Sequence, residues 1–161
     1  MRLLEVWVKS PMLREAELLI ASECLRVVNP QLLEELARGK VLLTVCPESD
    51  GSSYYGKLAS IIRSSNPRSL TVVTVDGSPH CFQVHAAVNE AAYVLGRHLN
   101  RTHYVVVDGR DLVRISPEAV RVARYLSLVD KLVRSNPAIL KELERHSLEY
   151  KLAKETRDAE L

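Results

Sequence analysis

The chain has few aromatic residues: one tryptophan, one phenylalanine and six tyrosines among 161 residues. A core built around large ring systems is therefore excluded, and the interior must consist of leucine, valine, isoleucine and alanine. A chain of this length buries roughly two-thirds of its unfolded surface on folding, so that it needs no disulfide. We expect one domain over residues 1–161.

The sequence also lacks a long hydrophobic run. No apolar stretch is long enough, or free enough of charge, to cross a bilayer. Residues 1–13 carry Glu5 and Lys9 within their apolar stretch and therefore do not resemble a signal peptide. Three cysteines cannot all pair within one chain. Together these features predict a cytoplasmic protein with reduced thiols and no membrane partner.

The chain also has almost no excess of basic over acidic residues. The formal net charge is +2, and no basic stripe is interleaved with aromatic residues, so we expect no nucleic-acid partner. The glycine patterns of dinucleotide-binding and P-loop sites are missing, as is the context of a nucleophile elbow. These absences remove the commonest nucleotide-binding and hydrolase classes.

Short apolar runs alternate with amphipathic stretches, which is typical of repeated β-α units. Strands are predicted at residues 3–8, 17–23, 41–45, 70–75, 104–107 and 112–115. Helices are predicted at residues 30–38, 54–64, 82–95, 117 to about 134, and in a last stretch after residue 137. Asp108-Gly109 is a strong hairpin signal between the last two strands. The pattern predicts a three-layer, Rossmann-like α/β domain with a mainly parallel sheet over residues 1–115 and C-terminal helices over residues 116–161.

Each cysteine lies near the carboxyl end of an apolar run. Cys24 and Cys46 follow their strands closely, and Cys81 comes just after the turn that follows the third run. The carboxyl ends of parallel strands meet at one edge of an open sheet, and ligands bind in the crevice there. We therefore expect the three thiols to approach one another although they are far apart in the sequence.

A metal site is one interpretation of this grouping. Cys81 lies near the start of a predicted helix, where the helix dipole favours the thiolate, and His80 is its neighbour. Three thiolates and one imidazole would complete a tetrahedral zinc site or hold an iron–sulfur cluster; the set is Cys24, Cys46, Cys81 and His80. His85 lies four residues after Cys81 on the same helical face and is more simply explained as a hydrogen-bonded core residue.

The alternative is that the cysteines are small buried hydrophobes. Close C-x-x-C pairs, which make a zinc or cluster assignment strong, are absent. Two weaker candidates are turns: residues 46–51, which lead into a helix and offer backbone N–H groups to an anion, and residues 76–79, which place Asp76 at a strand end. Caps and turns are the simpler explanation of both stretches.

Several of these stretches resemble one family. Residues 19–24 (LIASEC), 39–50 (GKVLLTVCPESD), 55–62 (YGKLASII) and 69–81 (SLTVVTVDGSPHC) resemble the α/β region of 4Fe-4S ferredoxin-type iron–sulfur binding proteins. The likeness spans roughly residues 17–95, about half of the chain. All three cysteines fall on cysteine positions of the family pattern, and this favours a shared site over separate buried thiols. The resemblance implies a metal- or cluster-binding role with a redox partner protein.

Two departures qualify the resemblance. His80 stands where the family has the first cysteine of a pair, so that any site would mix sulfur and nitrogen ligands. The ferredoxin module with its closely spaced cysteines is absent. A fainter likeness is to β-class carbonic anhydrases, which place a cysteine after one parallel strand and a histidine and a cysteine after another. Because the spacing differs here, that likeness is an analogy of fold.

Three functions remain open from the sequence. The first is a metal- or iron–sulfur-binding module with an accessory role in electron transfer. The second is a zinc-dependent lyase or hydrolase in which Asp50 or Asp76 handles a proton. The third is a non-catalytic interaction domain that forms a homodimer through its C-terminal helices, which carry apolar residues at helical spacing. Whether the protein is an enzyme is not decided by these patterns.

Overall fold

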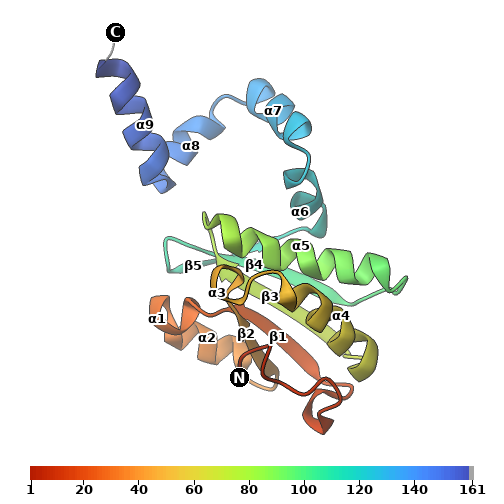
Figure 1. The fold of residues 1–161 in the computed structure, drawn as a ribbon. Helices are drawn as coiled ribbons and strands as arrows, with labels where there is room; N and C mark the ends of the chain where they lie inside the picture. Colours follow the sequence, from red (N-terminus) through yellow and green to blue (C-terminus); the bar gives the residue numbers. More distant parts are fainter. Residues whose placement is uncertain (160–161) are drawn as a thin grey trace. The chain divides into compact units, whose positions relative to one another are not determined.

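A five-stranded sheet organises the chain in the computed structural model, which describes residues 1–159 (Figure 1). The strands are β1 (Glu17–Ser22), β2 (Val41–Val45), β3 (Ser69–Val75), β4 (Arg101–Val107) and β5 (Asp111–Ile115). Their order across the sheet is β2-β1-β3-β4-β5. The first four strands are parallel, and β5 returns antiparallel to β4. The predicted mainly parallel sheet and the hairpin at Asp108-Gly109 are therefore confirmed.

Helices connect the parallel strands, as a β-α alternation requires. Those between the strands are α1 (Leu25–Val28), α2 (Pro30–Ala37), α3 (Pro47–Asp50), α4 (Ser53–Ser65) and α5 (Pro79–Val94). After β5 come α6 (Pro117–Ala123), α7 (Leu126–Ser135), α8 (Ile139–His146) and α9 (Leu148–Ala159). A single 3-10 turn, η1 (Pro11–Leu13), precedes β1.

Two apolar layers cover the two faces of the sheet, which gives the three-layer architecture that the sequence predicts. On one face, alternate residues of β1 and β3 pack against α4 and α5, with Ile20, Val72, Leu58 and Val88 all buried. On the other face, Leu19 and its neighbours pack against α1 and α2. Successive side chains of a strand point to opposite faces, so the unbroken apolar runs of β1 and β3 supply both layers.

Local signals explain where the main helices begin and end. The Asn29 side chain accepts a hydrogen bond from the Leu32 N–H at 3.0 Å and caps α2, whose first residue is a proline. Ser78 caps α5 by accepting from the Cys81 N–H at 3.3 Å. Asn66 ends α4 in the left-handed conformation, with φ of 48°. Because Ser78 is the cap and Pro79 the first helical residue, His80 and Cys81 lie inside the first turn of α5, three residues before the predicted start.

The prediction of a strand at residues 3–8 is wrong. Only Arg2 pairs in a β-bridge, with Thr44 on the edge of β2, and the residues after it form turns. Leu3 and Val6 are buried three residues apart, whereas Trp7 is exposed. A turn places residues three apart on one side, so the apolar residues pack on the core without an extended backbone.

The two predicted C-terminal helices are each broken in two. Residues 117 to 134 form α6 and α7, with a break at Tyr125, whose φ is −110° and ψ is 85°. The last predicted helix is split into α8 and α9 at Ser147, which has an extended backbone. The apolar spacing continues across both breaks, which is why periodicity alone did not reveal them.

The structure divides into two compact units, residues 1–121 and residues 122–161. The second unit, as far as it is described, holds helices α7, α8 and α9 with exposed apolar residues such as Leu132 and Leu143. The homodimer through these helices stays a prediction, which light scattering of the full chain would test. Among residues 1–159, no helix is long and apolar enough to cross a membrane.

Candidate functional site

The carboxyl edge of the sheet gathers all three cysteines. Cys24 follows β1, Cys46 follows β2 directly, and Cys81 lies in the first turn of the helix that follows β3. In the sheet, β1 has β2 on one side and β3 on the other. The strands remain parallel, but the side of the sheet on which the next strand is added changes at β1. Such a switch point between strands is where open α/β sheets bind ligands. The topology therefore places the three cysteines around the one crevice that the fold favours for binding.

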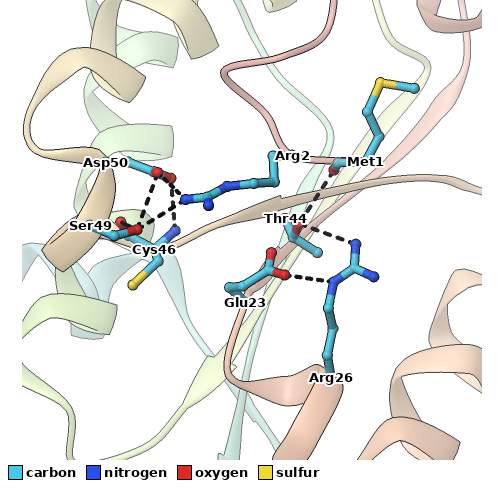
Figure 2. A network of polar contacts seen from close by, with 8 residues as sticks. All are labelled: Met1, Arg2, Glu23, Arg26, Thr44, Cys46, Ser49 and Asp50. Carbon is cyan, nitrogen blue, oxygen red and sulfur yellow. Dashed lines mark hydrogen bonds and ion pairs between the residues drawn. The ribbon is translucent and has the colours of Figure 1, made fainter.

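A carboxylate fixes the backbone around Cys46. The Asp50 side chain accepts a hydrogen bond from the Cys46 N–H at 3.0 Å and forms an ion pair with Arg2 (Figure 2). Arg2 also donates to the Ser49 hydroxyl at 3.0 Å. Because the loop's own carboxylate binds this N–H group, residues 46–51 do not present it to an anion. Asp50 is likewise held by Arg2 rather than free for proton transfer.

Beside it, the segment after β1 has a second polar cluster. The Arg26 guanidinium forms an ion pair with Glu23 at 2.9 Å and donates to the Thr44 hydroxyl at 3.4 Å (Figure 2). The second carboxylate oxygen of Glu23 and the hydroxyl of Ser22 are buried without a hydrogen-bond partner in the described part of the chain. Buried polar groups are normally satisfied. These two oxygen atoms, at the end of β1, can therefore accept a hydrogen bond from a water molecule or a ligand.

The third cysteine and the histidine lie at the start of α5. Cys81 is buried, at 5% exposure, whereas Cys46 is half-buried and Cys24 is exposed. His80 is exposed, and its Nδ1 lies 3.7 Å from a carboxylate oxygen of Glu48 in α3. His80 thus shares the same edge but is paired with an acid in this structure.

The charges of the other two cysteines affect the Cys24 thiol. Partial burial raises the pKa of the Cys24 thiol, and negative charge on Cys81 and on Cys46 raises it further, with a smaller contribution from Glu48. Charges that shift one another's pKa lie close together in space. The Cys24 thiol therefore senses the charges of Cys81 and Cys46, and the close approach of all three sulfur atoms stays a prediction.

The site is not a preformed metal cage. Among residues 1–159, no three histidine, cysteine, aspartate or glutamate side chains are arranged closely enough to hold a metal ion. The donor set has the right chemistry for zinc or an iron–sulfur cluster, since thiolates and imidazole are the preferred ligands. Its geometry fits only if the side chains draw together on binding.

A separate pair of buried histidines, which the sequence did not predict as a group, lies between α5 and the sheet. His85 accepts or donates a hydrogen bond with the Thr74 hydroxyl at 2.9 Å, and its Nδ1 lies 2.9 Å from Nδ1 of His103. Burial lowers the pKa of His85 to about 3, with a further contribution from His103. The interpretation of His85 as a hydrogen-bonded core residue is confirmed.

His103 was missed because it lies in an apolar strand. It is fully buried in β4, and burial, followed by the charges of Arg101 and Arg121, lowers its pKa to about 4. A polar residue at an inward position of a strand is a signal of a buried partner. That signal was present in the sequence. Nothing in the sequence, however, identified His85, 18 residues away in a helix, as the partner.

Comparison with known proteins gives one match. A family model described as a Rossmann-like domain covers residues 10–160. No curated protein and no solved structure matches the chain. The match agrees with the sheet and helix layers described above and adds no ligand or reaction.

Proposed function

Because the chain belongs to the family of Rossmann-like domains, we propose that it binds a metal centre at the carboxyl edge of its sheet, through the thiols of Cys24, Cys46 and Cys81. His80 is the proposed fourth ligand. The centre is zinc or an iron–sulfur cluster, and the role is that of an accessory module in electron transfer with a redox partner protein. The likeness of residues 17–95 to ferredoxin-type iron–sulfur binding proteins supports the cluster over zinc.

The observation that carries the proposal is the position of the three cysteines, which follow the adjacent parallel strands β1, β2 and β3 at one edge of the sheet. Partial burial and two neighbouring thiolates oppose ionisation of Cys24. A bound cation reverses this effect, because it stabilises every thiolate that contacts it. A crevice that gathers sulfur atoms which repel one another when ionised is thus a crevice suited to a soft cation.

The surrounding charge points the same way. Glu48 contributes to the negative potential at Cys24, and the free oxygen of Glu23 lies at the end of the same strand. Arg2 and Arg26 are engaged by Asp50 and Glu23. Each arginine is thus matched by a carboxylate, and Glu48 adds one further negative charge near Cys24 that favours a cation.

Binding requires the proposed ligands to draw together, because no three such side chains in the described structure are close enough to hold a metal ion. Cys24 is exposed and precedes a four-residue helix, so its side chain turns at little cost. His80 must leave Glu48, an exposed pair of small energy. Cys81 is buried and fixed by the capped start of α5, and we expect it to be the ligand about which the others close.

A catalytic zinc site, the alternative, has less support. Asp50, one of the two acids suggested for proton transfer, is bound by Arg2 and by the Cys46 N–H group. Asp76, the other, is exposed beyond the end of β3. A general base must be free to accept the proton that it removes, and Asp50 is already bound by two donors.

The test is metal analysis of the full chain purified without oxygen or chelators. We expect about one zinc per chain, or iron with acid-labile sulfide and visible absorbance. Cys24→Ser, at an exposed position that the fold tolerates, should lose the metal without loss of stability. His80→Gln should weaken retention, whereas His98→Gln, a change of the same kind at an exposed residue elsewhere, should not. Colourless protein without zinc or iron, which takes up neither on reconstitution, would refute the proposal.

A further inference from the structure

A second cavity lies at the opposite end of the parallel strands from the thiols. It has a volume of about 330 Å³, and its lining residues come from the start of β4, the end of β5 and the residues that follow β5. Its walls include Arg101, His103 and Arg114, and no acidic side chain lines it. A cavity of this size takes a small molecule, and its lining charge is positive.

Arg101 is held in place by neutral hydrogen-bond partners. Its Nε donates to the Asn89 side chain at 2.7 Å, and Asn89 in turn donates to the Pro117 carbonyl at 3.2 Å. No ion pair involves Arg101 in the described part of the chain. Burial, the largest effect, and the nearby charge of Arg121 lower the pKa of Arg101, whereas the charge of Glu118 raises it and offsets part of this shift. An anion in the cavity would offset the effects of burial and of Arg121 further.

His103, which also lines the cavity, carries a buried polar atom without a partner in the described structure. Its Nδ1 is hydrogen-bonded to His85, but its Nε2 is buried and without a partner among residues 1–159. The ring is neutral near pH 7 because of its lowered pKa, so one of its nitrogen atoms carries a proton.

The direction of the hydrogen-bond chain decides which nitrogen atom of His103 carries the proton, and the chain can run in two directions. When the Thr74 hydroxyl donates to Nε2 of His85, Nδ1 of His85 carries the proton and donates to Nδ1 of His103. The proton of His103 is then on Nε2, which becomes a buried donor without a partner among the described residues. An acceptor in the cavity favours this arrangement over its reverse.

We propose that this cavity binds the oxyanion group of a small ligand, a carboxylate or a phosphate, between Arg101 and Arg114, and that Nε2 of His103, buried in the free protein, becomes accessible on binding and donates a hydrogen bond to the anion. Arginine is suited to this role because its planar donors match both groups. The site is independent of the thiol crevice, and neither proposal needs the other.

The test uses the full chain labelled with ¹⁵N, titrated with inorganic phosphate and, separately, with acetate at constant ionic strength near pH 7. Long-range ¹H–¹⁵N spectra of the imidazoles report the protonated nitrogen of His103 directly. We expect a saturable shift of the His103 Nε2 signal in the protonated range with one anion or both. The tighter of the two identifies the class of ligand.

Variants separate a site from diffuse charge. Arg114→Gln, at an exposed position, should weaken binding by about fivefold, and Arg101→Lys, which loses the planar donors, by about tenfold. Arg110→Gln removes the same charge from the same hairpin outside the cavity and should leave affinity unchanged. An unmoved or unsaturable His103 signal would overturn the proposal, and so would an Arg110→Gln effect equal to that of Arg114→Gln. Because the readout is His103, a failure here leaves the metal proposal untouched.

Discussion

His85 and His103 are joined by a hydrogen bond of 2.9 Å between their Nδ1 atoms, inside the layer that separates α5 from the sheet. Only one of the two nitrogen atoms can carry the proton of this bond, so the bond requires at least one neutral ring. Burial lowers both pKa values, to about 3 for His85 and about 4 for His103. Both rings are therefore neutral in the folded protein over most of the accessible pH range.

This neutrality predicts that the fold weakens in mild acid. An unfolded histidine binds a proton below about pH 6.5, whereas the folded pair does not until near pH 4, so the unfolded state gains protons as the pH falls. Stability should decline between pH 6.5 and 4, by about 1.4 kcal/mol per pH unit for each histidine. Urea unfolding at pH 7.0 and 5.5 tests this, in a range where most carboxyl groups stay ionised. Ordinary titration of both rings near pH 6.5 by NMR would contradict it.

The threonine at the end of the same chain gives a second prediction. Thr74→Val removes the hydroxyl that bonds His85 and leaves a buried ring nitrogen without a partner, so we expect a loss of about 1–3 kcal/mol in the free energy of unfolding. Thr71→Val is a matched control on β3, because no hydrogen bond of the Thr71 side chain is present in the described structure. Equal effects of the two changes would show that the bond to His85 contributes nothing.

The sheet was the most predictable part of the molecule. Residues 41–45, a short run of apolar and β-branched residues after Gly39, form β2 with the predicted bounds. Residues 108–109 close the hairpin as their turn chemistry requires. In both cases the signal is local: strand propensity, a glycine and a change of period fall within a few residues.

The failures are equally physical. Leu3 and Val6 have the hydrophobicity of a strand, but their spacing of three residues suits the turn that buries them. The break at Tyr125 interrupts a helix without interrupting the apolar spacing, so no local pattern marks it. Side-chain contacts between residues far apart in the sequence leave no recognisable sequence pattern. Arg2 and Asp50 are 48 residues apart, and nothing near either one indicates the other.

For the site, the sequence located the thiols but not their surroundings. Strand ends placed Cys24, Cys46 and Cys81 at one edge because parallel strands share their direction. The free oxygen of Glu23 and the acid facing His80 depend on side-chain orientation, which strand positions do not determine.

The Arg2–Asp50 pair predicts how the Cys46 loop responds to mutation. Asp50→Ala leaves the Cys46 N–H group without its acceptor and Arg2 without its partner, so we expect stability to fall by about 1–3 kcal/mol. The loop should open, and the half-buried Cys46 should react faster with a thiol reagent such as DTNB. Glu48→Gln, a change at an exposed acid in the same short helix, should alter neither quantity by a similar amount. An unchanged rate at Cys46 after Asp50→Ala would mean that the carboxylate does not order this loop.

The mutual influence of the thiols makes a prediction about reactivity. Cys24 is the most exposed thiol, yet partial burial and negative charge on Cys81 and Cys46 raise its pKa. Alkylation requires the thiolate, so the midpoint of its rate profile should lie above that of a free thiol. Cys81→Ser and Cys46→Ser each remove one neighbouring charge, and each should move the midpoint down. Iodoacetamide labelling at several pH values, with mass spectrometry to separate the sites, measures this in metal-free protein. A midpoint that stays in place in both variants would mean that the thiols do not meet in solution, and the proposed metal centre would lose its ligands.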